Sequence, residues 1–212
     1  MALVTLAWLA LPAIAHALDV DVSAPRARSG YLWVDARLSD LFPAPVESSL
    51  SRGMPATLLL HAELWRKRSI WFDRVEHTFD ASVRVRYEVW NDVYRIERTG
   101  APPRTLGSLD SVRTLLERPI ALPVCGLDGV EEGVRYYVVV SATLVPLSVE
   151  DVQEVEGWLS GEVESKRHSG FGVFTELPQA LYDTVRNFAG FGDRHARAQS
   201  RVFDGSDLGV GR

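Results

Sequence analysis

The chain has 212 residues, of which 46% are hydrophobic and 24% are charged, and this composition is typical of globular proteins. The length suits a single domain, because all-β domains commonly reach about 200–250 residues. A net charge of −5 argues against general nucleic-acid binding, which normally requires a basic surface. The sequence therefore predicts one globular domain without a nucleic-acid partner.

Residues 1–17 differ in composition from the rest of the chain. Residues 1–15 carry no charged side chain, and the segment ends in the small-residue pattern Ala15-His16-Ala17. An apolar stretch of this length is too short to span about 30 Å of hydrocarbon, but it fits a secretory signal peptide with its cleavage site. No Lys or Arg precedes it, so a buried first element or an uncleaved anchor remain alternatives. We expect a signal peptide over 1–17 and a periplasmic or membrane-associated location.

Several segments alternate apolar and polar residues with period two, as half-buried strands do. The clearest are 31–38, 57–65 and 75–89, and the length of the last predicts a bend or bulge within it. Asn91 and Asp92 follow that strand and suit a tight hairpin turn, because both tolerate positive φ. Residues 134–145 are apolar on both faces, which predicts a central strand covered on both sides.

Helical patterns are fewer. Ser108 precedes an amphipathic segment that Pro119 ends, which predicts a short helix over 108–117. Two further helices are predicted to begin at Ser148 and Pro178, and a weaker pattern covers 46–52.

Strands come first in the chain and helices follow. This order favours a mainly β fold, an antiparallel β-sandwich (immunoglobulin-like or similar) with appended C-terminal helices, over alternating βαβ units. We expect the sandwich over 18–147, a helical extension over 148–204 and a flexible tail over 205–212.

A family resemblance rests on the order of short motifs between residues 38 and 96. An Arg-rich run, Arg66-Lys67-Arg68, is followed by Trp71-Phe72-Asp73 and then by the Asn91 hairpin. In this order the chain resembles the bacterial DUF4390 family, exported or membrane-associated domains of unknown function, over about 18–147. The resemblance implies no catalytic residues. It does imply one candidate partner, a membrane sensor protein, because members of the family are often encoded near one.

Catalytic and metal-binding patterns are weak. The one cysteine, Cys125, excludes an intramolecular disulfide and lies in an apolar setting, which predicts a buried, inert thiol. His61, Glu63 and His77 are possible metal ligands, but a zinc site needs three or four that converge. Neither a phosphate-binding loop nor a nucleophile elbow is present, so we predict no enzyme, no cofactor and no metal.

The strongest charge feature of the β region lies among aromatic residues. It comprises the candidate partner-binding residues Trp65, Arg66, Lys67, Arg68, Trp71 and Asp73. One interpretation is a solvated strand end whose aromatic residues fill the core. The other is a contact surface, since Arg and Trp are enriched at binding hot spots and cations beside aromatics suit an anionic lipid surface.

Together these features predict an exported, non-catalytic binding or accessory module of the bacterial cell envelope. The expected partner is an envelope protein, with a weak contact to an anionic membrane surface as a second contribution. A carrier of an apolar or lipid-like ligand is one alternative. A metal-dependent hydrolase built on His61, Glu63 and His77 is another.

Overall fold

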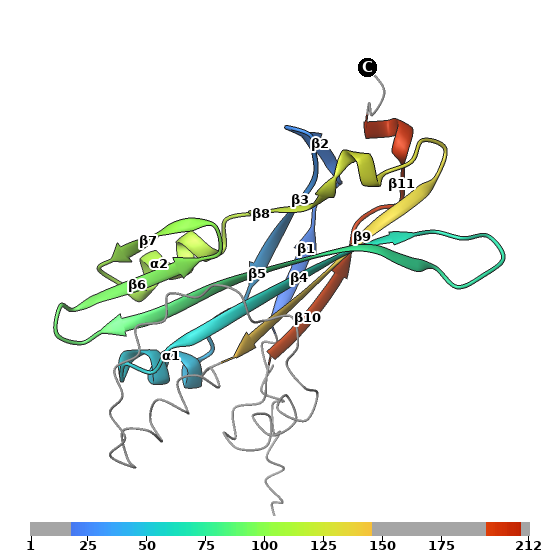
Figure 1. The fold of residues 1–212 in the computed structure, drawn as a ribbon. Coiled ribbons are helices and arrows are strands. Elements are labelled where there is room, and N and C mark those ends of the chain that lie inside the picture. Colours follow the sequence, from blue (N-terminus) through green and yellow to red (C-terminus); the bar gives the residue numbers. More distant parts are fainter. Residues whose placement is uncertain (1–17, 146–193, 209–212) are drawn as a thin grey trace, which may run out of the picture.

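The computed structural model describes residues 18–145 and 194–208, which form two antiparallel sheets (Figure 1). The predicted mainly β class is therefore confirmed. In the smaller sheet β3 is the central strand, pairing with β1 and β2 along one side and with β8 along the other. Its strands are β1 (Asp19–Val22), β2 (Arg26–Arg28), β3 (Tyr31–Ser39) and β8 (Ile120–Gly126).

The larger sheet has the strand order β10-β9-β4-β5-β6-β7, and the short β11 also pairs with β9. Its middle is a meander in which β4, β5, β6 and β7 each pair with the next strand. The strands are β4 (Ala56–Arg66), β5 (Arg74–Glu88), β6 (Val93–Arg98), β7 (Ala101–Leu106), β9 (Arg135–Val145), β10 (Arg194–Gln199) and β11 (Phe203–Asp204).

The core lies between the two sheets. β1 contacts β9 and β10, and β8 contacts β4 and β5, so the smaller sheet covers the inner face of the larger one. Every second side chain of each strand points into this space, because successive side chains of a strand point to opposite faces of the sheet. The fully buried large side chains include Leu32, Leu38, Leu58, Leu60, Leu64, Leu122, Tyr136 and Leu144.

The long strand β5 contains the predicted irregularity. Its pairing with β4 shifts between Leu64 and Trp65, which leaves Glu76 as an extra residue on β5. Such a bulge bends a strand and increases its twist. At its far end the turn spans residues 89–92, longer than the Asn91-Asp92 turn that the sequence predicted, and Asp92 has the positive φ of 52°.

Short helices lie where the local sequence predicted them. α1 covers Ala44–Ser51, and α2 covers Leu109–Leu116 with Ser108 as its N-cap. The Ser108 hydroxyl accepts a hydrogen bond from the amide of Ser111, which pairs one of the free amides of the first turn. Single 3₁₀ turns, η1 and η2, cover Leu127–Gly129 and Gly205–Leu208. Within the described ranges, no helix has the length and apolar character needed to cross a membrane.

The C-terminal prediction is wrong where the structure describes it. Residues 194–199 and 203–204, predicted as part of a helical extension, form β10 and β11 on β9, with Ala196 buried against the core. The tail is not loose over η2, because Gly205 is buried so closely that a Cβ would lie 2.1 Å from the Glu131 carbonyl oxygen. Both errors have one cause: these short segments gain their structure from partners far away in sequence. The predicted signal peptide and the helices at Ser148 and Pro178 lie outside the described residues.

Candidate binding surface

The β4–β5 loop, residues 67–73, joins the two longest neighbouring strands of the larger sheet. It projects beyond the other elements at one end of that sheet (Figure 1). Its tip, Ile70-Trp71-Phe72, is exposed to 89%, 76% and 95%. Monomeric proteins rarely leave a contiguous set of large apolar side chains in water without a functional reason. The tip is therefore the first candidate for a contact surface.

Hydrogen bonds fix the base of the loop. The amide of Lys67 donates to the carbonyl of Arg135 at 2.8 Å. Asp73 accepts from the amide of Arg68 at 2.9 Å and from the Tyr137 hydroxyl at 3.0 Å. These bonds, with the Arg68 amide as the main cause, lower the pKa of the Asp73 carboxyl below its ordinary value. The carboxylate therefore ties the two ends of the loop together and joins them to β9.

Trp65 belongs to this supporting structure. Its ring is half-buried and stacks on Tyr137, with a centroid distance of 6.1 Å and an interplanar angle of 7°. Its indole N–H donates to the Glu63 carboxylate at 3.0 Å, and Arg197 of β10 donates to the same oxygen at 3.1 Å. Burial and the bond to Asp73 together raise the pKa of the Tyr137 hydroxyl. Trp65 therefore supports the loop from the sheet face.

Arg66 is likewise held in place. Its guanidinium donates two hydrogen bonds to the Glu131 carboxylate, at 3.1 and 2.9 Å, and lies 3.9 Å from Glu76. The bond to Glu131 raises the pKa of Arg66 above its ordinary value. By contrast Lys67, Arg68 and Arg74 are exposed, and among the described residues none of the three is in an ion pair. These three side chains carry the positive charge beside the tip, and the charge of Lys67 also helps to lower the pKa of Asp73.

The structure thus divides the six residues that the sequence grouped together. Trp65, Arg66 and Asp73 form the base, whereas Lys67, Arg68 and Trp71 project. The interpretation in which the aromatic residues fill the core is wrong for Trp71 and Phe72, which face solvent. Ile70, Phe72 and Arg74 were not among the predicted site residues. They could have been found from the alternation, which stops at Arg66 and resumes at Arg74.

The possible metal ligands do not converge. His61 lies on the outer face of β4, 2.6 Å from Asp80 and 3.5 Å from Glu63. His77 pairs directly with Leu64, a fully buried residue of the inner face, and directly paired residues share a face. His77 therefore lies on the opposite side of the sheet from His61. In the described ranges, no three His, Cys, Asp or Glu side chains are grouped to hold a metal ion.

Cys125 lies in β8 with 9% of its surface exposed. Burial raises the pKa of its thiol to about 11, with a smaller contribution from the charge of Asp128. A thiol is nucleophilic as the thiolate, so this shift keeps Cys125 largely unreactive near neutral pH. The predicted burial of this residue is confirmed.

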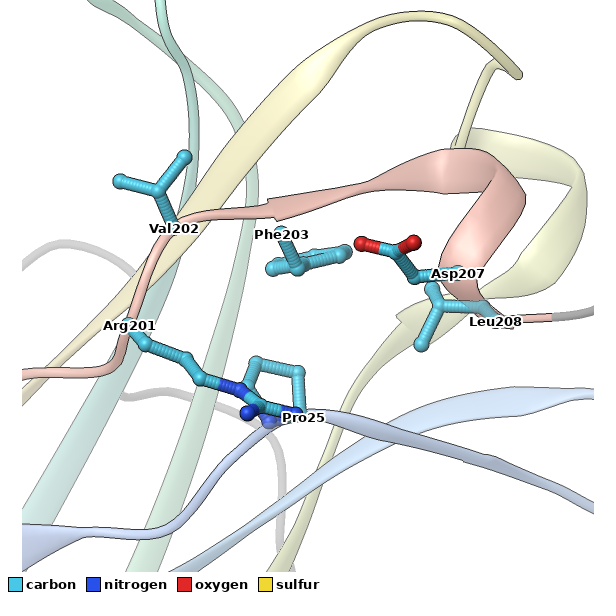
Figure 2. Close-up of a pocket in the computed structure, with 6 residues that line it drawn as sticks. All are labelled: Pro25, Arg201, Val202, Phe203, Asp207 and Leu208. Atoms are coloured by element: carbon cyan, nitrogen blue, oxygen red, sulfur yellow. The ribbon is translucent and has the colours of Figure 1, made fainter.

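A pocket lies where β11 and η2 meet the residue that precedes β2 (Figure 2). Phe203 forms its buried wall, and the exposed side chains of Arg201 and Asp207 lie on either side of it. The Asp207 carboxylate already accepts a hydrogen bond from the amide of Asp204 at 3.0 Å. This pocket combines the buried Pro25 and Phe203 with the charged, exposed Arg201 and Asp207, so it does not resemble the apolar interior that a lipid carrier needs.

Comparison with known proteins gives one match. The family model described as a domain of unknown function, DUF4390, matches residues 15–148. The chain belongs to this family. The matched range covers both sheets up to the end of β9 and includes the whole β4–β5 loop. No curated protein and no solved structure matches the chain.

Proposed function

We propose that this DUF4390 protein is a non-catalytic binding module of the bacterial cell envelope and that the β4–β5 loop is its contact element. The observation that carries the proposal is the loop tip, in which three consecutive large apolar side chains are each at least 76% exposed. Leaving such side chains in water costs free energy, which binding to an apolar surface would recover.

The construction of the loop also supports this role. Asp73 and the Trp65–Tyr137 stack hold its base, so the tip is presented on a supported hairpin. Preorganisation lowers the entropy lost when a contact forms. Three exposed cations next to the apolar side chains, none in an ion pair among the described residues, add a preference for negatively charged surfaces.

Binding accounts for the described residues better than catalysis does. The candidate metal ligands His61 and His77 occupy opposite faces of the sheet, and burial of the Cys125 thiol raises its pKa to about 11. An envelope location is supported by the apolar segment 1–17 and its Ala15-His16-Ala17 ending. The proposed partner is therefore a component of the envelope, and a membrane sensor protein is one candidate.

Site-specific photocrosslinking in cells tests this proposal. A photoreactive side chain is placed at Phe72, and at Trp90 as a control, because both residues are almost fully exposed at a hairpin tip. We expect adducts with envelope components from position 72 and few from position 90. The Lys67→Ser/Arg68→Ser variant should reduce the adducts from position 72. Equal adduct patterns at the two positions, or no adduct at 72, would overturn the proposal.

A further inference from the structure

The shape of the loop restricts what it can bind. The β4–β5 loop comprises residues 67–73, and it extends past the other elements at the end of the sheet (Figure 1). A stable protein–protein interface normally buries about 800 Å² on each partner and involves about 20–30 residues a side. The seven residues 67–73 are fewer than such an interface involves. A bilayer surface, in contrast, accepts a small convex insertion because lipids rearrange around it.

The chemistry of the tip matches the boundary between lipid headgroups and acyl chains. Trp is enriched at this depth, and Ile and Phe favour the apolar side of it. The side chains of Ile70, Trp71 and Phe72 have few contacts to lose, since each is at least 76% exposed. Insertion therefore requires no unfolding of the sandwich.

The exposed cations on both sides of the tip are suited to contact lipid phosphates. Lys67 and Arg68 precede the tip and Arg74 follows it, so positive charge flanks the apolar residues on both sides. Arg66 does not add to this charge, because Glu131 holds it. Each cation near an anionic membrane contributes on the order of 1 kcal/mol, or about fivefold in affinity.

The base of the loop sets the depth of insertion. Backbone polar groups without partners are too costly in hydrocarbon, so an irregular loop stops at the interface. The amide of Arg68 is already paired with Asp73, close beneath the tip. Interfacial segments typically bury their apolar side chains about 5–10 Å into the headgroup region.

We propose that the partner of the β4–β5 loop is an anionic phospholipid surface, into which Ile70, Trp71 and Phe72 insert while Lys67, Arg68 and Arg74 contact the headgroups. This inference rests on the proposed function and names the partner of the same loop. It identifies the loop as a reversible membrane anchor on a folded domain.

A polarity-sensitive fluorophore on the full chain tests insertion directly. It is attached at Phe72→Cys, with Trp90→Cys as the matched control, and the native Cys125 is protected by its burial. The probes are vesicles of phosphatidylcholine with phosphatidylglycerol, and vesicles of phosphatidylcholine alone. We expect blue-shifted, brighter emission from position 72 with the anionic vesicles only, and no change from position 90. Since residues 1–17 are themselves apolar, reporting from a defined site separates tip insertion from binding elsewhere.

Charge variants test the role of the cations. Lys67→Ser/Arg68→Ser should weaken binding to anionic vesicles by more than about tenfold. The control Arg28→Ser/Arg104→Ser removes the same charge from other exposed positions and should change binding much less. Higher salt should weaken wild-type binding, because the Debye length falls from about 10 Å at 0.1 M to about 3 Å at 1 M.

The outcomes separate this inference from the proposed function. Unchanged emission at position 72 with anionic vesicles would overturn the lipid inference. If position 72 still crosslinks to one envelope protein in cells, or to a second copy of the chain, the proposed function stands with a protein partner. If position 72 gives neither emission change nor adduct, both proposals fail.

Discussion

Strand β5 connects two hairpin tips that resemble each other in exposure and differ in chemistry. At one end Ile70, Trp71 and Phe72 project from the β4–β5 loop. At the other end Val89 and Trp90 are exposed to 59% and 98% in the β5–β6 loop, residues 89–92. Among the described residues, these five account for most of the exposed large apolar side chains.

The difference lies in what surrounds each tip. Lys67, Arg68 and Arg74 flank the first tip, and its base is bonded to β9 through Asp73. The second tip has Asp92 beside Trp90, and its bonds stay within the hairpin, as in the 2.7 Å bond from Tyr87 to Asp92. Exposure of apolar residues alone therefore does not distinguish the two tips. Their charge environment and their support distinguish the two ends of β5.

The comparison depends on labelling each tip without labelling the core. At pH 8, Phe72→Cys and Trp90→Cys should react with a thiol reagent more than about a hundredfold faster than Cys125, whose pKa is raised from 9.0 to about 11. The rate of disulfide exchange followed by absorbance measures this. The Cys125 rate should rise with pH through that pKa, and a fast native thiol at pH 8 would contradict the assigned burial.

Replacing the exposed apolar side chains of each tip should have very different effects on affinity for anionic vesicles. Ile70→Ser/Trp71→Ser/Phe72→Ser should lower affinity for anionic vesicles by about a hundredfold, because each large apolar side chain, only partly buried at the interface, contributes on the order of 1 kcal/mol, less than the value for full burial. Val89→Ser/Trp90→Ser should leave affinity within about twofold. Vesicle sedimentation gives the affinities. Thermal unfolding should hardly change in either variant, and a large loss of stability would mean that the tips pack on the core.

Loosening the base should have a smaller effect. Asp73→Ala removes the acceptor of the Arg68 amide and of the Tyr137 hydroxyl, so hydrogen exchange at Arg68 should become about tenfold faster. Exchange in residues 89–92 should not change. The matched variant Tyr87→Phe removes the bond to Asp92 and should affect the β5–β6 loop alone. Exchange measured by mass spectrometry would contradict the assignment if both loops changed in both variants.

Acid should mimic the Asp73 substitution in a defined range. The pKa of Asp73 is lower in the folded protein than its ordinary value of 3.8. Its stabilising contribution is therefore complete above about pH 4 and is lost as pH falls through the lower, folded pKa. Fluorescence from position 72, read without vesicles, should change below pH 3.8 in the wild-type background and stay flat with Asp73→Ala. A transition well above pH 4 would identify another group.

The smallest effect is expected from adding charge to the second tip. Asn91→Lys places one cation beside Trp90 and should raise its affinity for anionic vesicles by no more than about fivefold. The fluorophore is attached at Val89→Cys for this measurement. A gain equal to the affinity of the β4–β5 loop would mean that charge alone, without the anchored base, is sufficient.

Local patterns predicted the strands with regular alternation, such as β4, β5 and β9, since half-buried strands repeat with period two. Strands that interrupt this pattern could not be found in the same way. β7 contains Pro102 and Pro103, and β8 contains Pro123, which pairs beside an irregular register with β3. Proline is tolerated there because, in the part of the chain that the structure describes, these strands have one neighbour each, which is a property of the sheet and not of the segment.

The sequence predicted that these residues lie together between two strands, but not that they differ in burial and bonding. The sequence grouped Arg66 with Lys67 and Arg68 because they are adjacent. The partner that fixes Arg66 is Glu131, 65 residues further along the chain, and no local pattern connects them. Phe72 is exposed because the β4–β5 loop extends past the neighbouring strands β9 and β10. The fold determines where those strands end, and no local pattern shows it.

The prolines of β7 have a consequence for self-association. Among the described residues β7 is the last strand at its side of the larger sheet, and proline has no amide hydrogen to offer an added strand. Successive residues of a strand direct their backbone amides to opposite edges of the strand. Because Pro102 and Pro103 are consecutive, each edge of this segment lacks one amide donor. A second chain therefore finds an incomplete set of donors at this edge, which disfavours open-ended edge-to-edge aggregation.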